Sequence, residues 1–363
     1  MEPRSSTGPT LPREGWDRLV RPGMAALSYG FLHPCQSTLA GMAWAPLTID
    51  DGEGAPLVRC PAFVHRVTLG QHGPPVLRSA IGRLGVDIME TGNPCAPSAP
   101  ALSRPGYRWL QALWSHFLAH GRARLLVVRD VLADSSLARE LSQRGFARIG
   151  ERPTFVLELL GSEMSAYLRA MRADYRRRVR RILDLPLEVD VEASFASLAG
   201  EMAELFALNA ARSSESRVET IELKLIETWS ELDASRAITV RDPSSGARCV
   251  GLVLVDRPVL HFVRCGFREP AGRQLGLYRR LLYELVRLGY DSGCSYVDFG
   301  VTSAEPKLRT GARPVPLQIW ARARRSWLQP LVRLAERPRP AMVSRRVFRE
   351  PLQPDGHWYR PSA

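Results

Sequence analysis

The 363-residue chain contains almost no lysine. Of its 50 basic residues only Lys224 and Lys307 are lysines, and the others are arginines. Such a skew is typical of a GC-rich coding background, so arginine at any one position carries little weight by itself. The net charge of +13 still creates a field that attracts anions, among them nucleotide carriers, RNA and acidic lipids. Charge alone does not choose among these partners.

Long apolar runs and processing signals are also missing. The sequence has no run of about 18 apolar residues, so no membrane span is expected. Its first residues lack the apolar centre of a signal peptide, and we therefore expect a cytoplasmic protein. The six cysteines stand far apart without C-x-x-C spacing, which is typical of buried apolar residues in a reducing compartment.

Several catalytic signatures are absent as well. The sequence has no G-x-S-x-G, no P-loop, and no G-x-G-x-x-G after a predicted strand. His116 and His120 have the spacing of two metal ligands on a helix, but the glutamate of H-E-x-x-H is missing, so we predict no metal site. The composition is that of a globular protein, and the length favours two domains over one.

One stretch, residues 259–321, has an order of elements that implies a site. Val259–Phe267 is apolar and β-prone and predicts a strand. Leu277–Asp291 has leucines at helical spacing, and residues 295–300 and 314–321 predict two further strands. Between the first strand and the helix lies the turn Arg273-Gln274-Leu275-Gly276.

This turn predicts an anion-binding site. The first turn of a helix has free backbone N–H groups and partial positive charge. Gly276 allows close approach to the backbone, Arg273 adds a cation, and the N–H groups of Leu277 and Tyr278 would meet the ligand. The pyrophosphate of a nucleotide-like carrier or the backbone of an RNA would suit such a turn. An ordinary β-turn-α corner is the alternative.

Upstream, residues 162–185 predict one long helix that begins at a Ser162 cap. Six arginines surround Tyr175 in its second half. We interpret part of this surface as one that meets phosphates; a solvated basic face is the alternative. The predicted substrate-binding residues are Tyr175, Arg176, Arg177 and Arg180.

The N-terminal half predicts a fainter copy of the same pattern. Residues 25–69 suggest short antiparallel strands. A helix at 107–120, a strand at 124–129, a helix at 135–143 and a strand at 154–159 follow. Tyr107, Arg108 and Leu110 echo Tyr278, Arg279 and Leu281, which suggests a duplicated lobe.

These segments together resemble the GNAT acyltransferases, and more specifically the GNAT-like proteins related to Fem-type peptidoglycan aminoacyltransferases. The resemblance rests on the order of residues 277–282 (LYRRLL), 297–300 (VDFG) and 307–312 (KLRTGA), with a further match at 175–181 (YRRRVRR). In that family the second and third motifs typically read DFG and K-x-x-x-G-A. The resemblance covers residues 165–322 well and the N-terminal half in outline.

The resemblance implies an α/β fold of tandem GNAT-like lobes, with mixed central sheets flanked by helices. It implies a degenerate N-terminal lobe at 16–160 and an acyltransferase lobe at 161–322. We expect a disordered leader at 1–15 and a basic tail at 323–363.

The function implied is transfer of an acyl group from a thioester carrier, acyl-CoA in the first place, to an amine acceptor that is a small molecule or a peptide. One alternative is an aminoacyl-tRNA-dependent transferase of Fem type, with tRNA as a partner. The other is a non-catalytic protein that binds nucleic acid or an anionic surface. The sequence does not indicate the oligomeric state.

Asp298 and Lys307 are the predicted catalytic residues. Asp298 ends a strand beside the anion turn, where an acceptor amine would approach; a carboxylate that only caps a turn is the alternative. At Lys307 a compact ammonium can reach an oxygen where a planar guanidinium would not fit, and the resembled family has a lysine in this motif near the reactive end of the site. Tyr278 replaces the last small residue of the acyl-CoA loop R/Q-x-x-G-x-G/A, which keeps aminoacyl-tRNA open as donor.

Overall fold

The computed structural model describes residues 4–6, 13–39, 41–68, 85–212, 221–334 and 345–349. Parts of the predicted leader and of the predicted basic tail lie outside the described residues. Within the leader, strand β1 (Arg4–Ser6) pairs with β3 (Leu47–Asp50), and helix α1 (Arg13–Asp17) begins.

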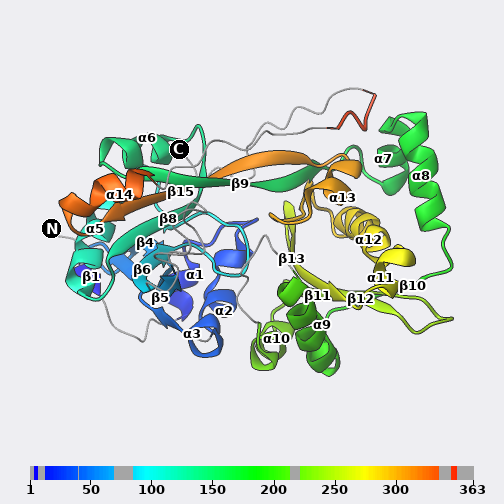
Figure 1. Cartoon of the computed structure of the whole chain (residues 1–363), viewed down its shortest axis with the longest axis horizontal. Coiled ribbons are helices and arrows are strands. Elements are labelled where there is room, and N and C mark those ends of the chain that lie inside the picture. The colour runs from blue at the N-terminus through cyan, green and yellow to red at the C-terminus, as the bar shows by residue number, and fades with distance from the viewer. Residues whose placement is uncertain are drawn as a thin grey trace.

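An 11-stranded mixed sheet runs through both halves of the molecule (Figure 1). Its spatial order is β10-β11-β12-β13-β14-β9-β15-β8-β6-β5-β2. Two of its neighbouring pairs are parallel, β13 with β14 and β6 with β8. The strands are β2 (Met42–Trp44), β5 (Ala62–Thr68), β6 (Gly85–Thr91), β8 (Leu125–Leu132), β9 (Ala147–Glu158), β10 (Glu188–Glu192), β11 (Ser235–Arg241), β12 (Arg248–Asp256), β13 (Val259–Phe267), β14 (Tyr296–Asp298) and β15 (Arg313–Ala323).

Strands β9 and β15 exchange places between the two halves. β9 follows the N-terminal strands in the chain but pairs with β14, whereas β15 follows β14 in the chain but pairs with β8. The two strands also pair antiparallel with each other over most of their length, and they run side by side along the top of Figure 1. Each half of the sheet is therefore completed by a strand from the other half.

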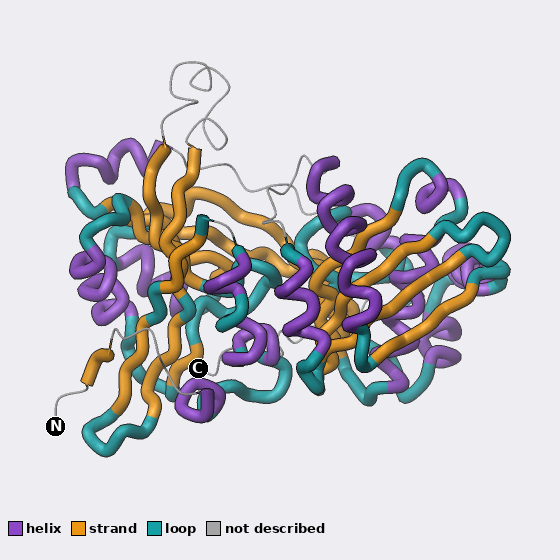
Figure 2. The backbone as a smooth tube through the Cα atoms, turned by 90° about the horizontal axis from the view of Figure 1, so that it is seen from below, coloured by secondary structure: helices purple, strands orange, loops and turns teal. Residues whose placement is uncertain are grey.

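Helices cover both faces of the sheet, and Figure 2 shows the two groups of strands with helices packed around them. In the C-terminal half α12 (Leu277–Asp291) buries an apolar stripe, including Leu281 and Leu285, in one core cluster. On the opposite face α9 (Ala199–Arg212) and α10 (Leu223–Ser230) form another. In the N-terminal half α5 (Leu110–His120) and α6 (Ser136–Gln143) cover one face, and α14 (Gln329–Leu334) packs on the other. No helix in the described ranges is long and apolar enough to cross a membrane.

The two halves repeat one order of elements. The N-terminal lobe reads β5-β6-α5-β8-α6-β9, and the C-terminal lobe reads β12-β13-α12-β14-α13-β15, with α13 at Ala304–Arg309. The predicted α/β architecture of tandem lobes with mixed sheet strands is confirmed. The sequence echo is not positional, because Tyr107 precedes α5 whereas Tyr278 lies inside α12.

The predicted strand Val259–Phe267 and helix Leu277–Asp291 are confirmed with the same bounds. The single long helix over 162–185 is wrong, because the chain forms α7 (Met164–Ala170) and α8 (Ala173–Leu183) with an extended Met171 between them. Met171 forms a β-bridge with Phe348 from the C-terminal segment, and Arg172 N–H donates to Val347 O at 3.0 Å. Glu163, not Ser162, precedes α7.

The predicted run of strands over 25–69 is correct only in its second part. Residues 25–38 form short helical segments instead: a 3₁₀ turn at Ala25–Leu27, α2 (Tyr29–Leu32) and α3 (Cys35–Thr38). The Ser28 hydroxyl accepts a hydrogen bond from Phe31 N–H and so caps α2. β4 (Pro56–Cys60), β3, β1 and β7 (Leu102–Ser103) form a separate small sheet.

Candidate active site

The site begins where β13 and β14 separate. Their parallel pairing covers only Val259–His261 against Tyr296–Asp298, although β13 continues to Phe267. The ladder between β12 and β13 also slips at Val263, which has no partner residue in β12. Among the described strands none pairs with the rest of this β13 edge. The gap is approached by the start of α12, the loop after β14, and α13.

Asp298 and His261 face each other across the last step of this parallel pair. Asp298 is 2% exposed, and its Oδ1 accepts hydrogen bonds from Thr154 Oγ1 at 2.5 Å and from Gly300 N–H at 2.9 Å. Its Oδ2 lies 3.8 Å from His261 Nδ1. His261 Nε2 lies 2.9 Å from Gly23 O, and a carbonyl oxygen can only accept, so this nitrogen carries a hydrogen. His261 Nδ1 is buried and has no hydrogen-bond partner among the residues that the structure describes.

Lys307 approaches the same loop from the other side. It is 1% exposed, and its ammonium donates to Gly300 O at 3.0 Å. The ammonium also lies 5.7 Å from the centre of the Phe155 ring. Gly300 has a φ of 72°, so the turn uses the left-handed region that glycine tolerates. The two predicted catalytic residues therefore meet at one residue, since Asp298 accepts from the N–H of Gly300 and Lys307 donates to its carbonyl.

Tyr278 connects this interior to the predicted anion turn. Its ring stacks on Phe267 with centroids 6.0 Å apart. Burial raises the pKa of Tyr278 well above its usual value, and the neighbouring Cys265 adds to the effect. The hydrogen bond from Cys249, opposed by burial and helped by the Lys307 charge, lowers the pKa of the Cys265 thiol.

The predicted anion turn is in place at the start of α12. Gly276 precedes the helix with a φ of 72°, so it is left-handed and the amides of Leu277, Tyr278 and Arg279 open the helix. The short helix α11 (Ala271–Gln274) intervenes between β13 and this glycine. Arg273 is 84% exposed and pairs with Glu269 at 3.1 Å.

Arg279, not Arg273, is the cation beside Gly276. Its Nη2 is 3.3 Å from the position that a Cβ on Gly276 would occupy. The sequence placed Arg279 in a family motif without assigning it to the site, although its position three residues after Gly276 was a usable signal.

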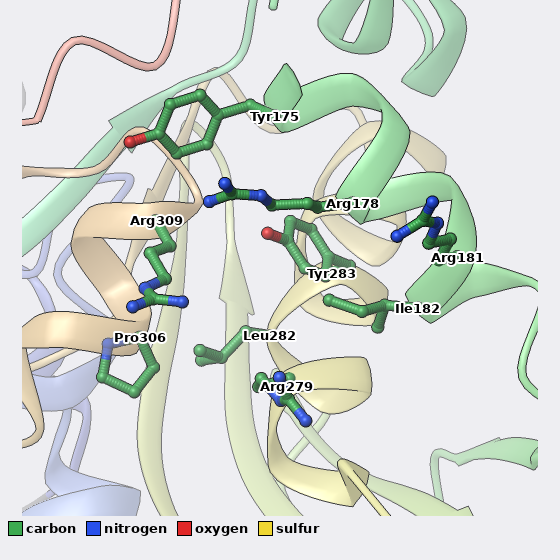
Figure 3. Close-up of a pocket in the computed structure, with 9 residues that line it drawn as sticks. All are labelled: Tyr175, Arg178, Arg181, Ile182, Arg279, Leu282, Tyr283, Pro306 and Arg309. Atoms are coloured by element: carbon green, nitrogen blue, oxygen red, sulfur yellow. The ribbon is translucent and has the colours of Figure 1, made fainter. Parts of the chain in front are cut away.

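Beyond Arg279 lies a cavity of about 230 Å³ between α8, α12 and α13 (Figure 3). We call it the arginine cavity. Four guanidinium groups and two tyrosine rings surround a small apolar floor in this space. The lining residues are Tyr175, Arg178, Arg181, Ile182, Arg279, Leu282, Tyr283, Pro306 and Arg309.

The predicted substrate-binding residues on α8 divide between two faces. Tyr175 lines the arginine cavity, together with Arg178 and Arg181. Arg176, Arg177 and Arg180 border a second hollow with Ala173 and Asp184, and Arg181 lines both hollows. Helical spacing explains the division, because residues three and four apart share a face.

His261 is a further residue of this site that sequence reasoning missed, besides Arg279. A single histidine within the apolar strand VLHFVRCGF was the available signal. Its pairing with Asp298 depends on the parallel register of two strands, which the sequence does not state. In the part of the chain that the structure describes, no group of three or more His, Cys, Asp or Glu side chains could hold a metal ion. His116 Nε2 lies 3.1 Å from Ala45 O, a structural contact.

Part of the chain that holds this site matches a known domain model. Residues 169–308 match the family model described as acetyltransferase (GNAT) domain. The match spans β13, α12, β14 and the start of α13, and it includes Gly276, Asp298 and Lys307. No curated protein matches the sequence.

Solved structures resemble the chain over most of its length. A crystal structure of FemX is 13% identical, covers 92% of this chain and 100% of its own, and superposes with a TM-score of 0.61. A conserved protein of unknown function from Bacteroides thetaiotaomicron VPI-5482 is 8% identical, covers 86% and 97%, and has a TM-score of 0.52. Residues 169–308 therefore match an acetyltransferase (GNAT) domain, and the chain as a whole has the fold of the FemX structure.

Proposed function

We propose that the chain transfers an acyl group from a phosphate-bearing thioester carrier, acyl-CoA in the first place, to an amine acceptor. The observation that carries the proposal is the start of α12. There a left-handed glycine, the opening helix amides and the Arg279 guanidinium stand between the open edge of β13 and the arginine cavity. Phosphate is the ligand that suits such a helix start.

The unpaired edge of β13 could bind the arm of the carrier that connects its phosphate to its acyl group. From Phe262 to Phe267 this edge spans about 17 Å at the rise of an extended strand. Its backbone groups can exchange hydrogen bonds with the amides of a carrier arm, as an added strand would. The acyl end would then lie toward His261 and Asp298, where β13 and β14 meet.

Asp298 and His261 supply the proton acceptor. The amine nitrogen attacks the thioester carbonyl carbon, the C–N bond forms, the C–S bond breaks, and the carrier leaves as a thiolate that takes up a proton. The proton that the amine loses passes to the Asp298–His261 pair. Since His261 Nε2 donates to Gly23 O, Nδ1 receives the proton, and the Asp298 carboxylate 3.8 Å away stabilises the imidazolium.

Lys307 acts on this pair through Gly300. Its ammonium fixes the Gly300 carbonyl, and the N–H of the same residue fixes Asp298 Oδ1. Lys307 is thus a positioning residue for the carboxylate. It also adds positive charge near Cys265, on the β13 strand that would hold the donor.

Calorimetric titration with acetyl-CoA tests the donor. Gly276→Asn keeps the left-handed backbone, which asparagine tolerates, but places a side chain where the phosphate must approach. We expect donor affinity to fall about tenfold or more, roughly the loss of one charge-assisted hydrogen bond. Gly276→Val is a poorer probe, because its β-branched side chain would also strain this backbone.

Gly145→Asn is the matched control, since Gly145 is left-handed with open space around it and lies after α6 in the other lobe. It should leave donor affinity unchanged. Unaltered affinity in a folded Gly276→Asn variant, or no transfer from any acyl-CoA to a panel of amines, would overturn the proposal.

A charged tRNA is the second candidate donor, because α8 presents arginines on two faces. Each neutralised phosphate steepens the log–log salt dependence by about 0.7 to 0.9. Transfer from acyl-CoA and from aminoacyl-tRNA, measured between about 50 and 200 mM salt, separates the two. A steep slope with tRNA and no transfer from acyl-CoA would establish the second donor.

A further inference from the structure

We infer that the arginine cavity binds a terminal phosphate monoester of the donor, at the nucleotide end that lies beyond the Gly276 turn. This inference rests on the proposed function and adds a second phosphate site to it. It assigns the recognition to Arg178 and Arg181 of α8 and to Arg279 of α12.

The charges of the cavity call for an anion. Arg309 pairs with Glu305 at 2.8 Å, so its charge is compensated. Arg178, Arg181 and Arg279 have no carboxylate partner among the residues that the structure describes. Arg178 and Arg181 lie three residues apart on α8, where like charges repel one another. A phosphate dianion would remove this repulsion and would accept from several guanidinium groups at once.

The walls of the cavity favour a phosphate attached to an aromatic base. The Arg178 guanidinium lies 5.8 Å from the centre of the Tyr175 ring, and Tyr283 faces the same space (Figure 3). Leu282, Ile182 and Pro306 form an apolar floor. A nucleoside can stack on such walls while its phosphate meets the arginines.

Position and size fit one end of a donor. Arg279 borders both the Gly276 turn and the cavity, so phosphates bound at the two places would belong to one molecule. The volume of about 230 Å³ lies below that of a pocket for a whole drug-sized ligand, so it suits a terminal group.

Two triple variants test the inference with equal loss of charge. Arg178→Gln, Arg181→Gln and Arg279→Gln remove the three cavity arginines without a carboxylate partner among the described residues. Arg176→Gln, Arg177→Gln and Arg180→Gln remove three arginines that border only the second hollow, which Arg181 also borders. The probes are coenzyme A, dephospho-coenzyme A and adenosine 3′,5′-bisphosphate, titrated by calorimetry. We expect the wild-type chain to bind coenzyme A about tenfold or more tightly than the dephospho form, as charge-assisted hydrogen bonds to one phosphate imply.

The cavity triple variant should erase that difference and weaken bisphosphate binding by a similar factor. The control triple variant should retain the difference, with affinities within a few-fold of wild type. Equal losses in both variants would mean a general electrostatic field and would overturn the inference. Coenzyme A binding that is weakened by Gly276→Asn but unchanged in the cavity triple variant would overturn the inference too. That result would leave the proposed function standing. If none of the three probes binds, the thioester donor falls as well.

Discussion

The two lobes build the same junction and use it differently. In each, a parallel pair of strands separates after a few residues and a helix connects them: β6, α5 and β8 in one, β13, α12 and β14 in the other. In the N-terminal lobe the chain itself fills the opening, since residues 91–102 are almost entirely buried. Within this segment the Asn93 side chain donates a hydrogen bond to Ala26 O and accepts one from Cys95 N–H. In the C-terminal lobe no described strand pairs with the β14 side of β13 beyond His261.

The helix starts differ in the same sense. α5 follows Trp109, a bulky residue in ordinary helical conformation that is 8% exposed. α12 follows the left-handed Gly276, with no side chain over the opening amides. One junction is a packed corner in the first lobe and, as we propose, an anion site in the second, and the two differ in the residue before the helix and in the preceding segment.

The charges of the two lobes are arranged in opposite ways. In the N-terminal lobe acids and bases are paired: Glu90 contacts His65 at 2.9 Å and Arg129 at 3.4 Å. In the C-terminal lobe the arginine cavity has an excess of bases. We interpret the first arrangement as structural and the second as a binding site.

The largest expected effect compares two strand histidines that each face a carboxylate. His261→Gln can still donate to Gly23 O but cannot take up a proton, so kcat/KM should fall by about 10² to 10⁴. His65→Gln is the control in the other lobe and should stay within a few-fold in activity. Steady-state kinetics on both variants, with circular dichroism to confirm folding, provides the measurement. Equal activities would remove the proposed difference between the lobes.

Lys307 should give the next largest effect. Lys307→Met and Lys307→Arg should both lower kcat by about tenfold or more, because neither places a compact ammonium against Gly300 O. Their stabilities should differ: the buried guanidinium overpacks and costs about 1–3 kcal/mol, whereas methionine fits the volume. Kinetics and chemical denaturation measure the two effects. A Lys307→Arg enzyme with native activity would contradict the positioning role.

Glu90 should affect stability rather than activity. Burial alone would raise the pKa of Glu90, but the Arg129 charge and the contact with His65 outweigh it and lower the pKa to about 2. The stabilisation is present above the unfolded value of 4.5 and is lost as pH falls towards 2. It amounts to at most about 3 kcal/mol, at 1.36 kcal/mol for each pKa unit.

Glu90→Gln should therefore lower the unfolding free energy at pH 7 and flatten its decline between pH 4.5 and 2. Urea denaturation over this pH range is the measurement. Asp298→Asn, in the other lobe, should impair transfer instead. If the unfolding free energy of Glu90→Gln declined between pH 4.5 and 2 as steeply as that of the wild type, other carboxylates would be responsible for the decline.

The smallest expected effect locates the cation at the start of α12. Arg273→Gln should change donor affinity by no more than about threefold, because Arg273 is 84% exposed and its pair with Glu269 is a surface pair. Arg279→Gln should weaken the donor by more, since Arg279 borders both the glycine turn and the cavity. Calorimetry with acetyl-CoA measures the loss of affinity in each variant. A larger loss in Arg273→Gln than in Arg279→Gln would show that Arg273 is the cation that contacts the donor.

The sequence by itself determined those parts whose cause is local. Apolar runs and leucine spacing gave β13 and α12 their observed bounds, and the glycine before α12 marked the left-handed turn. The motif and the scarcity of lysine point to Asp298 and Lys307, and the structure brings both to the backbone of Gly300. These features need no more than a few neighbouring residues to specify them.

Only the tertiary structure decided the remainder, because each case depends on contacts between segments far apart in the chain. The break at Met171 is made by Phe348, and the pairing of His261 with Asp298 is made by strand register. The exchange of β9 with β15 and the choice of Arg178 over Arg177 for the cavity depend on which neighbour each element packs against. Local periodicity specifies a face of a helix or strand, whereas the partner of that face is fixed only when distant segments meet.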